Sequence, residues 1–185
     1  MATVRSTTTT LLVIDVQESV LAGCSDVDGV LERINELARV ARSNGSPVVY
    51  VQHQDPHDPK MAVGSPGWQL ASALERLADD PVVAKSYRDS FVQTELHAML
   101  TASGTRRLVV TGAHSDYCVQ TTALSALSHG YDLTLVSDAH TAQAAQLPEA
   151  TVPAATVVAF INDRLRGLRY PGRGIEVLPT AKVSF

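Results

Sequence analysis

The chain has 185 residues, 45% of them hydrophobic, and a formal net charge of −4 at pH 7. This length fits a single domain, residues 1–185, with one sizeable core. The negative charge and the lack of a clustered Lys/Arg run argue against a nucleic-acid partner. No stretch approaches the roughly 20 apolar residues needed to span a bilayer, which argues against a membrane partner.

Two further features of the sequence bear on the cellular compartment. The two cysteines, Cys24 and Cys118, offer no disulfide framework, which fits a reducing environment. The N-terminus runs Met-Ala-Thr-Val-Arg and reaches four threonines before a short apolar strand, so we expect no signal peptide. We therefore expect a cytoplasmic protein.

Strand-like and helix-like segments alternate along the chain. Apolar runs predict strands at Leu11–Ile14, Val48–Val51, Val82–Ala84, Leu108–Thr111, Leu133–Val136 and Ile175–Leu178. The segments between them predict helices at Val27–Ser43, from Trp68 through Leu77, at Gln93–Ser103, from a cap at Ser115 or Asp116 to Gly130, and at Glu149–Leu168. This alternation predicts an α/β fold: a three-layer αβα arrangement around a six-stranded, mostly parallel, Rossmann-like sheet. The usual strand order of this fold class, 3-2-1-4-5-6, would make the strands before Asp15 and Cys118 neighbours.

Three reactive side chains follow predicted strands at their carboxyl ends. Asp15 and Lys85 come directly after the first and third strands. Cys118 lies in the first turn of a predicted helix, where unpaired N–H groups and the helix dipole favour a thiolate. Because ligands of open parallel sheets bind outside the carboxyl ends of the strands, we expect all three at one rim. Cys118 is therefore a candidate nucleophile, and a buried structural cysteine is the alternative.

Four motifs carry a resemblance to a known family. They are Leu-Leu-Val-Ile-Asp-Val-Gln at 11–17, Lys85 followed by Ser90-Phe91 and Thr94-Glu-Leu96, Gly-Ala-His-Ser-Asp-Tyr-Cys-Val at 112–119, and Ser-Asp-Ala at 137–139. In this order they resemble the isochorismatase-like cysteine hydrolases, a superfamily that includes nicotinamidases, N-carbamoylsarcosine amidohydrolase, maleamate and ureide amidohydrolases, and streptothricin hydrolase. The resemblance implies the isochorismatase-like hydrolase fold and a triad of Asp15, Lys85 and Cys118.

The chemistry implied by this resemblance is hydrolysis of a small amide, ureide or lactam C–N bond through a thioester. Asp15 would take the thiol proton, and Lys85 together with the helix terminus would hold Cys118 as thiolate. The resemblance assigns the oxyanion hole to the backbone N–H groups of His114 and Cys118. It also implies a cis peptide bond between Ala113 and His114. No cofactor is expected.

Two other functions compete with this amidohydrolase hypothesis. One is vinyl-ether hydrolysis of the isochorismatase type, which the full Asp/Lys/Cys set disfavours. The other is a non-catalytic binding or thiol-redox protein on the same fold, although redox chemistry would ordinarily want a resolving cysteine. In each enzymatic case the partner is a small-molecule substrate, and family members are commonly dimers or tetramers, so we expect a homo-oligomer.

Several polar and aromatic side chains are candidates for contact with the substrate. Gln17 matches the family's Asp-x-Gln, where the glutamine frames the site, although a strand-end residue bonded to backbone is the alternative. The other candidates lie near the triad or in a Gly/Pro-rich loop, and they are Trp68, Tyr87, Phe91 and Tyr117.

The loop after the second strand contains the metal-ligand residue types His53, Asp55 and His57. Nicotinamidases of the family place Asp-x-His here, with a later histidine, to hold a divalent ion. This chain has the reverse order, His53-x-Asp55, and Trp68-Gln69 where the later histidine would stand. We therefore expect no metal and a capped surface loop.

Overall fold

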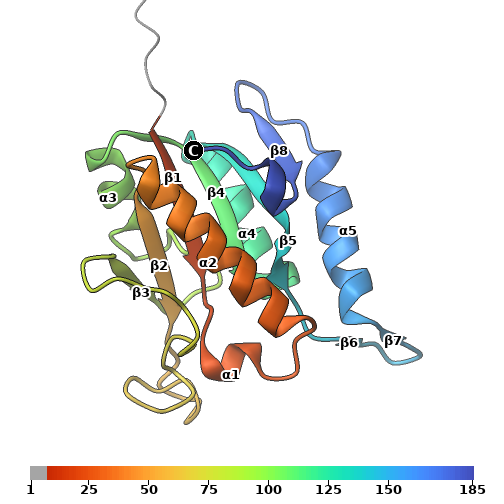
Figure 1. Ribbon diagram of the computed structural model, residues 1–185. Helices are drawn as coiled ribbons and strands as arrows, with labels where there is room; N and C mark the ends of the chain where they lie inside the picture. Colours follow the sequence, from red (N-terminus) through yellow and green to blue (C-terminus); the bar gives the residue numbers. More distant parts are fainter. Residues whose placement is uncertain (1–7) are drawn as a thin grey trace, which may run out of the picture.

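A six-stranded parallel sheet forms the centre of the computed structural model, which describes residues 8–185 (Figure 1). The strands lie in the order β3-β2-β1-β4-β5-β8, which confirms the expected 3-2-1-4-5-6 arrangement. Their bounds are β1 Thr8–Ile14, β2 Val48–His53, β3 Val82–Lys85, β4 Thr105–Ala113, β5 Asp132–Thr141 and β8 Ile175–Leu178. A separate short antiparallel pair joins β6 (Ala145–Gln146) to β7 (Thr151–Val152).

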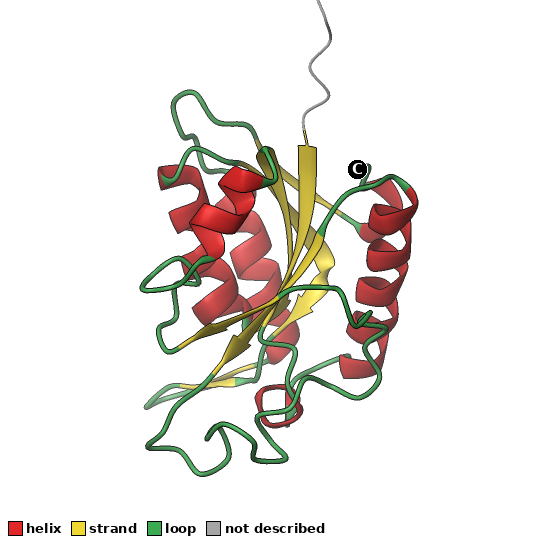
Figure 2. Ribbon diagram, turned by 90° about the vertical axis from the view of Figure 1, so that its left-hand side faces the viewer, coloured by secondary structure: helices red, strands yellow, loops and turns green. Residues whose placement is uncertain are grey.

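Helices cover both faces of this sheet, which gives the expected three layers (Figure 2). Helix α2 (Val27–Ser43) packs on one face. The opposite face carries α3 (Leu96–Ala102), α4 (Gln120–Ser128) and α5 (Ala154–Arg166). The remaining helical pieces are α1 (Glu18–Leu21), the π-helical turn Ser115–Val119 before α4, and a 3-10 turn at Thr180–Lys182.

Strand β1 lies at the centre of the core. Its last four residues, Leu11, Leu12, Val13 and Ile14, are all 0% exposed. Because successive side chains of a strand point to opposite faces, Leu11 and Val13 pack under α2, and Leu12 and Ile14 pack under the other helices. Full burial of such a side chain contributes about 1.5–3 kcal/mol. The rigid strand therefore delivers Asp15 to a fixed position at its carboxyl end.

The helix expected from Trp68 through Leu77 is absent, and this prediction is wrong. The backbone there is irregular because its polar groups bond to other elements. The amide of residue 71 donates to Val16, and the Asn35 side chain holds both the Ala73 carbonyl and the Glu75 amide. These contacts hold the segment against Val16, just after β1, and against α2, so the backbone groups do not close helical turns.

Two other expected helices are shorter than their sequence patterns indicate. Helix α5 begins only at Ala154 because Pro153 fixes the chain at its N-cap and the residues before it form the β6–β7 hairpin. Helix α3 begins at Leu96, three residues late, after Gln93 adopts a left-handed φ of 55°. Among residues 8–185, no helix is both long enough and apolar enough to span a membrane. The N-terminal threonine run, on which the signal-peptide expectation rests, lies partly outside the described residues.

Candidate active site

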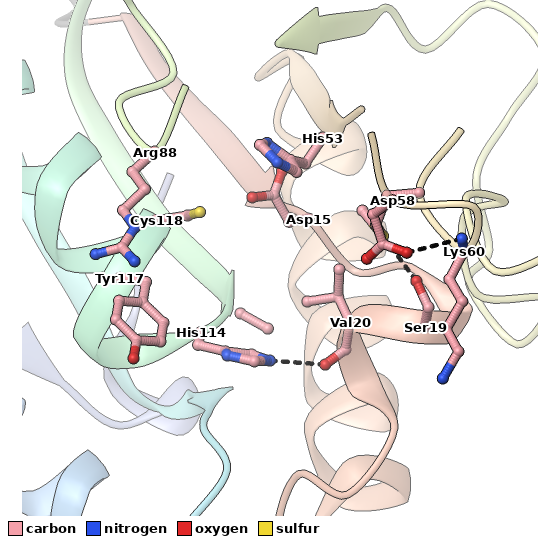
Figure 3. A pocket seen from close by; sticks show the side chains of 12 residues that line it. Asp15, Ser19, Val20, His53, Asp58, Lys60, Arg88, His114, Tyr117 and Cys118 are labelled. Carbon is pink, nitrogen blue, oxygen red and sulfur yellow. Dashed lines mark hydrogen bonds between the residues drawn. The ribbon is translucent and has the colours of Figure 1, made fainter. Parts of the chain in front are cut away.

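A cavity of about 250 Å³ opens at the carboxyl end of the sheet, where the residues that line it converge from several strand ends (Figure 3). Its lining comes from the ends of β1, β2 and β4, from α1, from the π-helical turn and from two loops. The lining residues are Asp15, Ser19, Val20, His53, Asp58, Lys60, Met61, Arg88, Ala113, His114, Tyr117 and Cys118. The structure therefore brings Asp15 and Cys118 into one cavity, although they are 103 residues apart in the sequence.

Asp15 and Lys85 form a buried ion pair at this cavity. Lys85 Nζ lies 2.7 Å from Asp15 Oδ2, and the side chains are 0% and 2% exposed. Both carboxylate oxygens of Asp15 are buried without a hydrogen-bond partner among the described residues, and only Oδ2 takes part in the ion pair. Asp15 also adopts a left-handed φ of 50° at the end of β1, a conformation that aspartate tolerates better than most residues. One carboxylate oxygen is thus held by the ammonium and the other is free to accept a proton.

The Lys85 ammonium has two further neighbours. Nζ donates to the Tyr87 carbonyl at 3.0 Å and lies 3.4 Å from His53 Nδ1. The Asp15 carboxylate, the Tyr87 carbonyl and the His53 imidazole therefore surround the ammonium. Lys85 is therefore enclosed behind Asp15 and does not itself line the cavity.

The Cys118 thiol is half-buried at the cavity wall. Burial and the negative charge of Asp15 together raise its pKa to about 12, although Lys85 acts in the opposite direction. The expectation that the helix terminus and Lys85 hold a thiolate is wrong, because desolvation outweighs them. Cys118 is a neutral thiol at neutral pH, and it needs a base to react.

The segment that carries Cys118 is tied to helix α1 and to strand β5. The peptide bond between Ala113 and His114 is cis, and His114 Nε2–H donates to the Val20 carbonyl at 2.7 Å. Neither Ser115 nor Asp116 makes the expected helix cap. Ser115 Oγ instead bonds the buried His140 at 2.7 Å, and so anchors the π-helical turn to β5.

A glycine permits the close approach of the two strands that lead to Asp15 and to this segment. Gly112 in β4 has a φ of +119°, and a Cβ at this position would lie 2.0 Å from the Ile14 carbonyl oxygen. A residue with a side chain fits neither the conformation nor the space. Gly112 therefore sets how near Ala113 and His114 lie to the end of β1.

Four of the five candidate substrate contacts do not line the cavity. Gln17 is 0% exposed and bonds both backbone groups of His53, at 2.7 and 2.9 Å, so it frames the site. Trp68 lies in the loop and its carbonyl accepts a hydrogen bond from Gln17. Tyr87 is 47% exposed and offers its carbonyl to Lys85. Phe91 belongs to the core, where its ring stacks on His129 with centroids 4.5 Å apart.

Tyr117 does line the cavity, and with it a residue that the sequence analysis missed. The Arg88 guanidinium lies over the Tyr117 ring, 4.1 Å from its centroid, and forms no ion pair with any residue from 8 to 185. The side chains of Val20 and Met61 form an apolar part of the cavity wall. Arg88 stands three residues after Lys85, and this spacing was the one signal that could have identified it.

The loop with His53, Asp55 and His57 does not assemble a ligand set. Asp55 Oδ1 accepts a hydrogen bond from the His57 backbone amide at 2.8 Å, which is a local turn contact. Within residues 8–185, no three His, Cys, Asp or Glu side chains lie close enough together to hold a metal ion. His53 points instead to the Lys85 ammonium.

Comparisons with known proteins agree with this fold and site. The family model described as the isochorismatase domain matches residues 9–157. Streptothricin hydrolase of Streptomyces noursei is 34% identical over 174 residues, which is 92% of this chain and 62% of that protein. Maleamate amidohydrolase of Pseudomonas putida is 26% identical over 127 residues, 60% of each chain. A crystal structure of an isochorismatase from Pseudomonas putida matches with a TM-score of 0.83 at 29% identity and covers 95% of this chain and 89% of that chain.

The family match spans well over half of the chain and coincides with the strand ends that form the cavity. The chain therefore belongs to the isochorismatase family. It spans less than two thirds of the length of the streptothricin hydrolase that it matches.

Proposed function

We propose that this protein is a cysteine hydrolase that cleaves a small amide, ureide or lactam C–N bond through a thioester intermediate. The observation that carries the proposal is the buried Asp15–Lys85 pair in contact with the cavity that holds the Cys118 thiol. A thiol with a raised pKa beside a carboxylate oxygen that has no partner is a nucleophile with its base in place. Relatives named streptothricin hydrolase and maleamate amidohydrolase support the hydrolase assignment.

In the first half-reaction, Asp15 takes the thiol proton as Cys118 sulfur attacks the carbonyl carbon of the substrate. The backbone N–H groups of His114 and Cys118 stabilise the negative oxygen of the tetrahedral intermediate. The C–N bond then breaks, and Asp15 returns its proton to the leaving nitrogen. The products of this step are a thioester on Cys118 and free ammonia or amine.

In the second half-reaction, the Asp15 carboxylate takes a proton from water, and the resulting hydroxide attacks the thioester carbonyl. The C–S bond breaks, the thiolate recovers the proton from Asp15, and a carboxylic acid leaves. Lys85 remains an ammonium throughout and positions Asp15. A single carboxylate therefore serves both half-reactions, which matches the enclosure of the Lys85 ammonium by its three acceptors.

A substrate panel tests this proposal against the other functions. Ammonia release is measured with succinamate, nicotinamide and N-carbamoylglycine, and ring opening of δ-valerolactam is followed by mass spectrometry. Intact-mass measurement after rapid quenching should show the acyl group on Cys118. Release of pyruvate from isochorismate, with no cleavage of any C–N bond in the panel, would favour the vinyl-ether hydrolase instead.

A further inference from the structure

His53 is the one imidazole in direct contact with the buried ion pair, among residues 8–185. Its Nδ1 lies 3.4 Å from Lys85 Nζ, and the side chain lines the cavity next to Asp15 (Figure 3). Gln17, two residues after Asp15, holds His53 by both backbone groups. The segment that carries the base therefore also fixes the position of this imidazole.

The contact with Lys85 determines which nitrogen of His53 carries the proton. An ammonium can only donate, so Nδ1 must accept, and the proton of a neutral imidazole then lies on Nε2. Burial lowers the pKa of His53, and the Lys85 charge lowers it further. The carboxylates that face it, Asp15 from β1 and Asp55 from its own loop, act in the opposite direction. His53 is therefore neutral at pH 7.

The Nε2–H group is left without a partner. No described residue accepts a hydrogen bond from it, and Nε2 is not among the atoms that the structure both buries and leaves unpartnered. It is therefore a fixed donor that a molecule in the cavity can reach. Its position is prepared by Gln17 and Lys85 before anything binds, which reduces the entropy lost on binding.

We propose that His53 is a further binding residue of the reaction centre: Nδ1 accepts a hydrogen bond from Lys85, and Nε2–H donates to a carbonyl-type acceptor of the bound amide. This inference deepens the proposed function and rests on it for the identity of the substrate as an amide. It assigns the substrate class as molecules with a hydrogen-bond acceptor, not an ammonium group, on the side that faces β2. Lys85 and Nε2–H together disfavour a cation there.

Two substitutions distinguish the roles of the two ring nitrogens of His53. In H53N, the asparagine amide oxygen can lie near the position of Nδ1 and accept a hydrogen bond from Lys85. The asparagine side chain is too short to reach the position of Nε2. Glutamine in H53Q can place an amide N–H near the position of Nε2. H57N is the matched control, because His57 is an exposed histidine of the same loop that does not line the cavity.

The readout is alkylation of Cys118 by iodoacetamide, which carries an amide, and by iodomethane, which does not. The ratio of the two rates cancels any change in the reactivity of the thiol itself. We expect H53N to lower this ratio by roughly 3- to 10-fold, the loss of one neutral hydrogen bond, and H53Q and H57N to keep it near the wild-type value. An unchanged ratio in H53N, with a wild-type thermal melt, overturns the substrate contact.

The tautomer is tested on the free protein by ¹⁵N NMR of the histidine side chains at pH 7. A neutral His53 with its proton on Nε2 is expected, and a proton on Nδ1 or an imidazolium overturns the proposal. Both measurements require no turnover. If the amide panel is not hydrolysed but the ratio and the tautomer are as expected, the proposed function fails and amide recognition by His53 stands.

Discussion

The two cysteines of this chain have similar acidity and different neighbours. Burial raises the pKa of Cys118 to about 12 and that of Cys24 to about 11. Cys118 lines the same cavity as Asp15, and Lys85 lies behind Asp15. Cys24 Sγ donates to the Val20 carbonyl, 3.3 Å away, and does not line that cavity.

Under the proposed mechanism, a neighbouring carboxylate base, not a low pKa, distinguishes Cys118 from Cys24. A thiol with a pKa of about 12 contains almost no thiolate at pH 7. Asp15 makes Cys118 less acidic at rest, yet in the proposed mechanism it removes the thiol proton when a substrate arrives. In that mechanism, the same neighbour lowers the acidity of the thiol and supplies its base.

The largest expected effect separates the two thiols directly. Cys118→Ala should lower turnover of the best panel substrate by about 10⁴-fold or more, because no other group can form the thioester. Cys24→Ala should keep turnover within a few-fold of wild type. Steady-state rates and thermal melts of both variants provide the check. Equal losses in the two variants would remove the distinction between the thiols.

Asp15→Asn isolates the base. Turnover should fall by roughly 10²- to 10⁴-fold, as is common when a general base is lost. Removal of the carboxylate charge should at the same time lower the pKa of Cys118, because Asp15 raises it in the wild type. Single-turnover rates and thiolate absorbance against pH measure the two effects. A more acidic thiol with wild-type turnover would contradict the triad mechanism.

Lys85→Met tests the buried ion pair. The substitution keeps the aliphatic stem but leaves the Asp15 carboxylate buried and uncompensated, which should cost about 3–5 kcal/mol in the free energy of unfolding. Chemical denaturation of both single variants and of the Asp15→Asn/Lys85→Met double variant gives the coupling energy. We expect the double variant to be more stable than Lys85→Met alone.

The smallest expected effect concerns the pH dependence of stability. Both thiol pKa values are raised in the folded state, so the folded chain keeps protons that the unfolded chain loses above its thiol pKa of about 9. The stabilisation is complete below pH 9 and is lost as pH rises towards 12, by roughly 1 kcal/mol per pH unit for Cys118. Chemical denaturation of wild type and Cys118→Ala from pH 8 to 11 measures the free energy of unfolding of each protein. The difference between the two free energies should become smaller as the pH rises. A constant difference would mean that burial does not raise this pKa.

Much of the fold could be predicted because its signals are local. The apolar runs and the polar residues that follow them predicted six parallel strands and the positions of Asp15 and Lys85 at the carboxyl edge. The family resemblance supplied the cis peptide bond, which the residues themselves do not encode. The roles of the triad, the homo-oligomer and the cytoplasmic location stay predictions.

The failures of prediction concern contacts between distant segments. The segment after Trp68 has a helix-like pattern, but Asn35 captures its backbone from α2. Phe91 follows Lys85 closely in sequence, yet its ring turns into the core against His129. The pKa of Cys118 was misjudged because burial is a property of the packed molecule, whereas a helix start is visible in the sequence.

The contact of Gly112 with Ile14 also marks which positions are open to redesign. Position 112 accepts only glycine, because any side chain would push β1 and β4 apart and shift His114 relative to Asp15. Val20 is a better position to vary. Its backbone carbonyl accepts the hydrogen bond from His114, whereas its side chain only lines the cavity. A mutant library intended to change which substrates fit in this cavity should therefore vary Val20 and keep Gly112 constant.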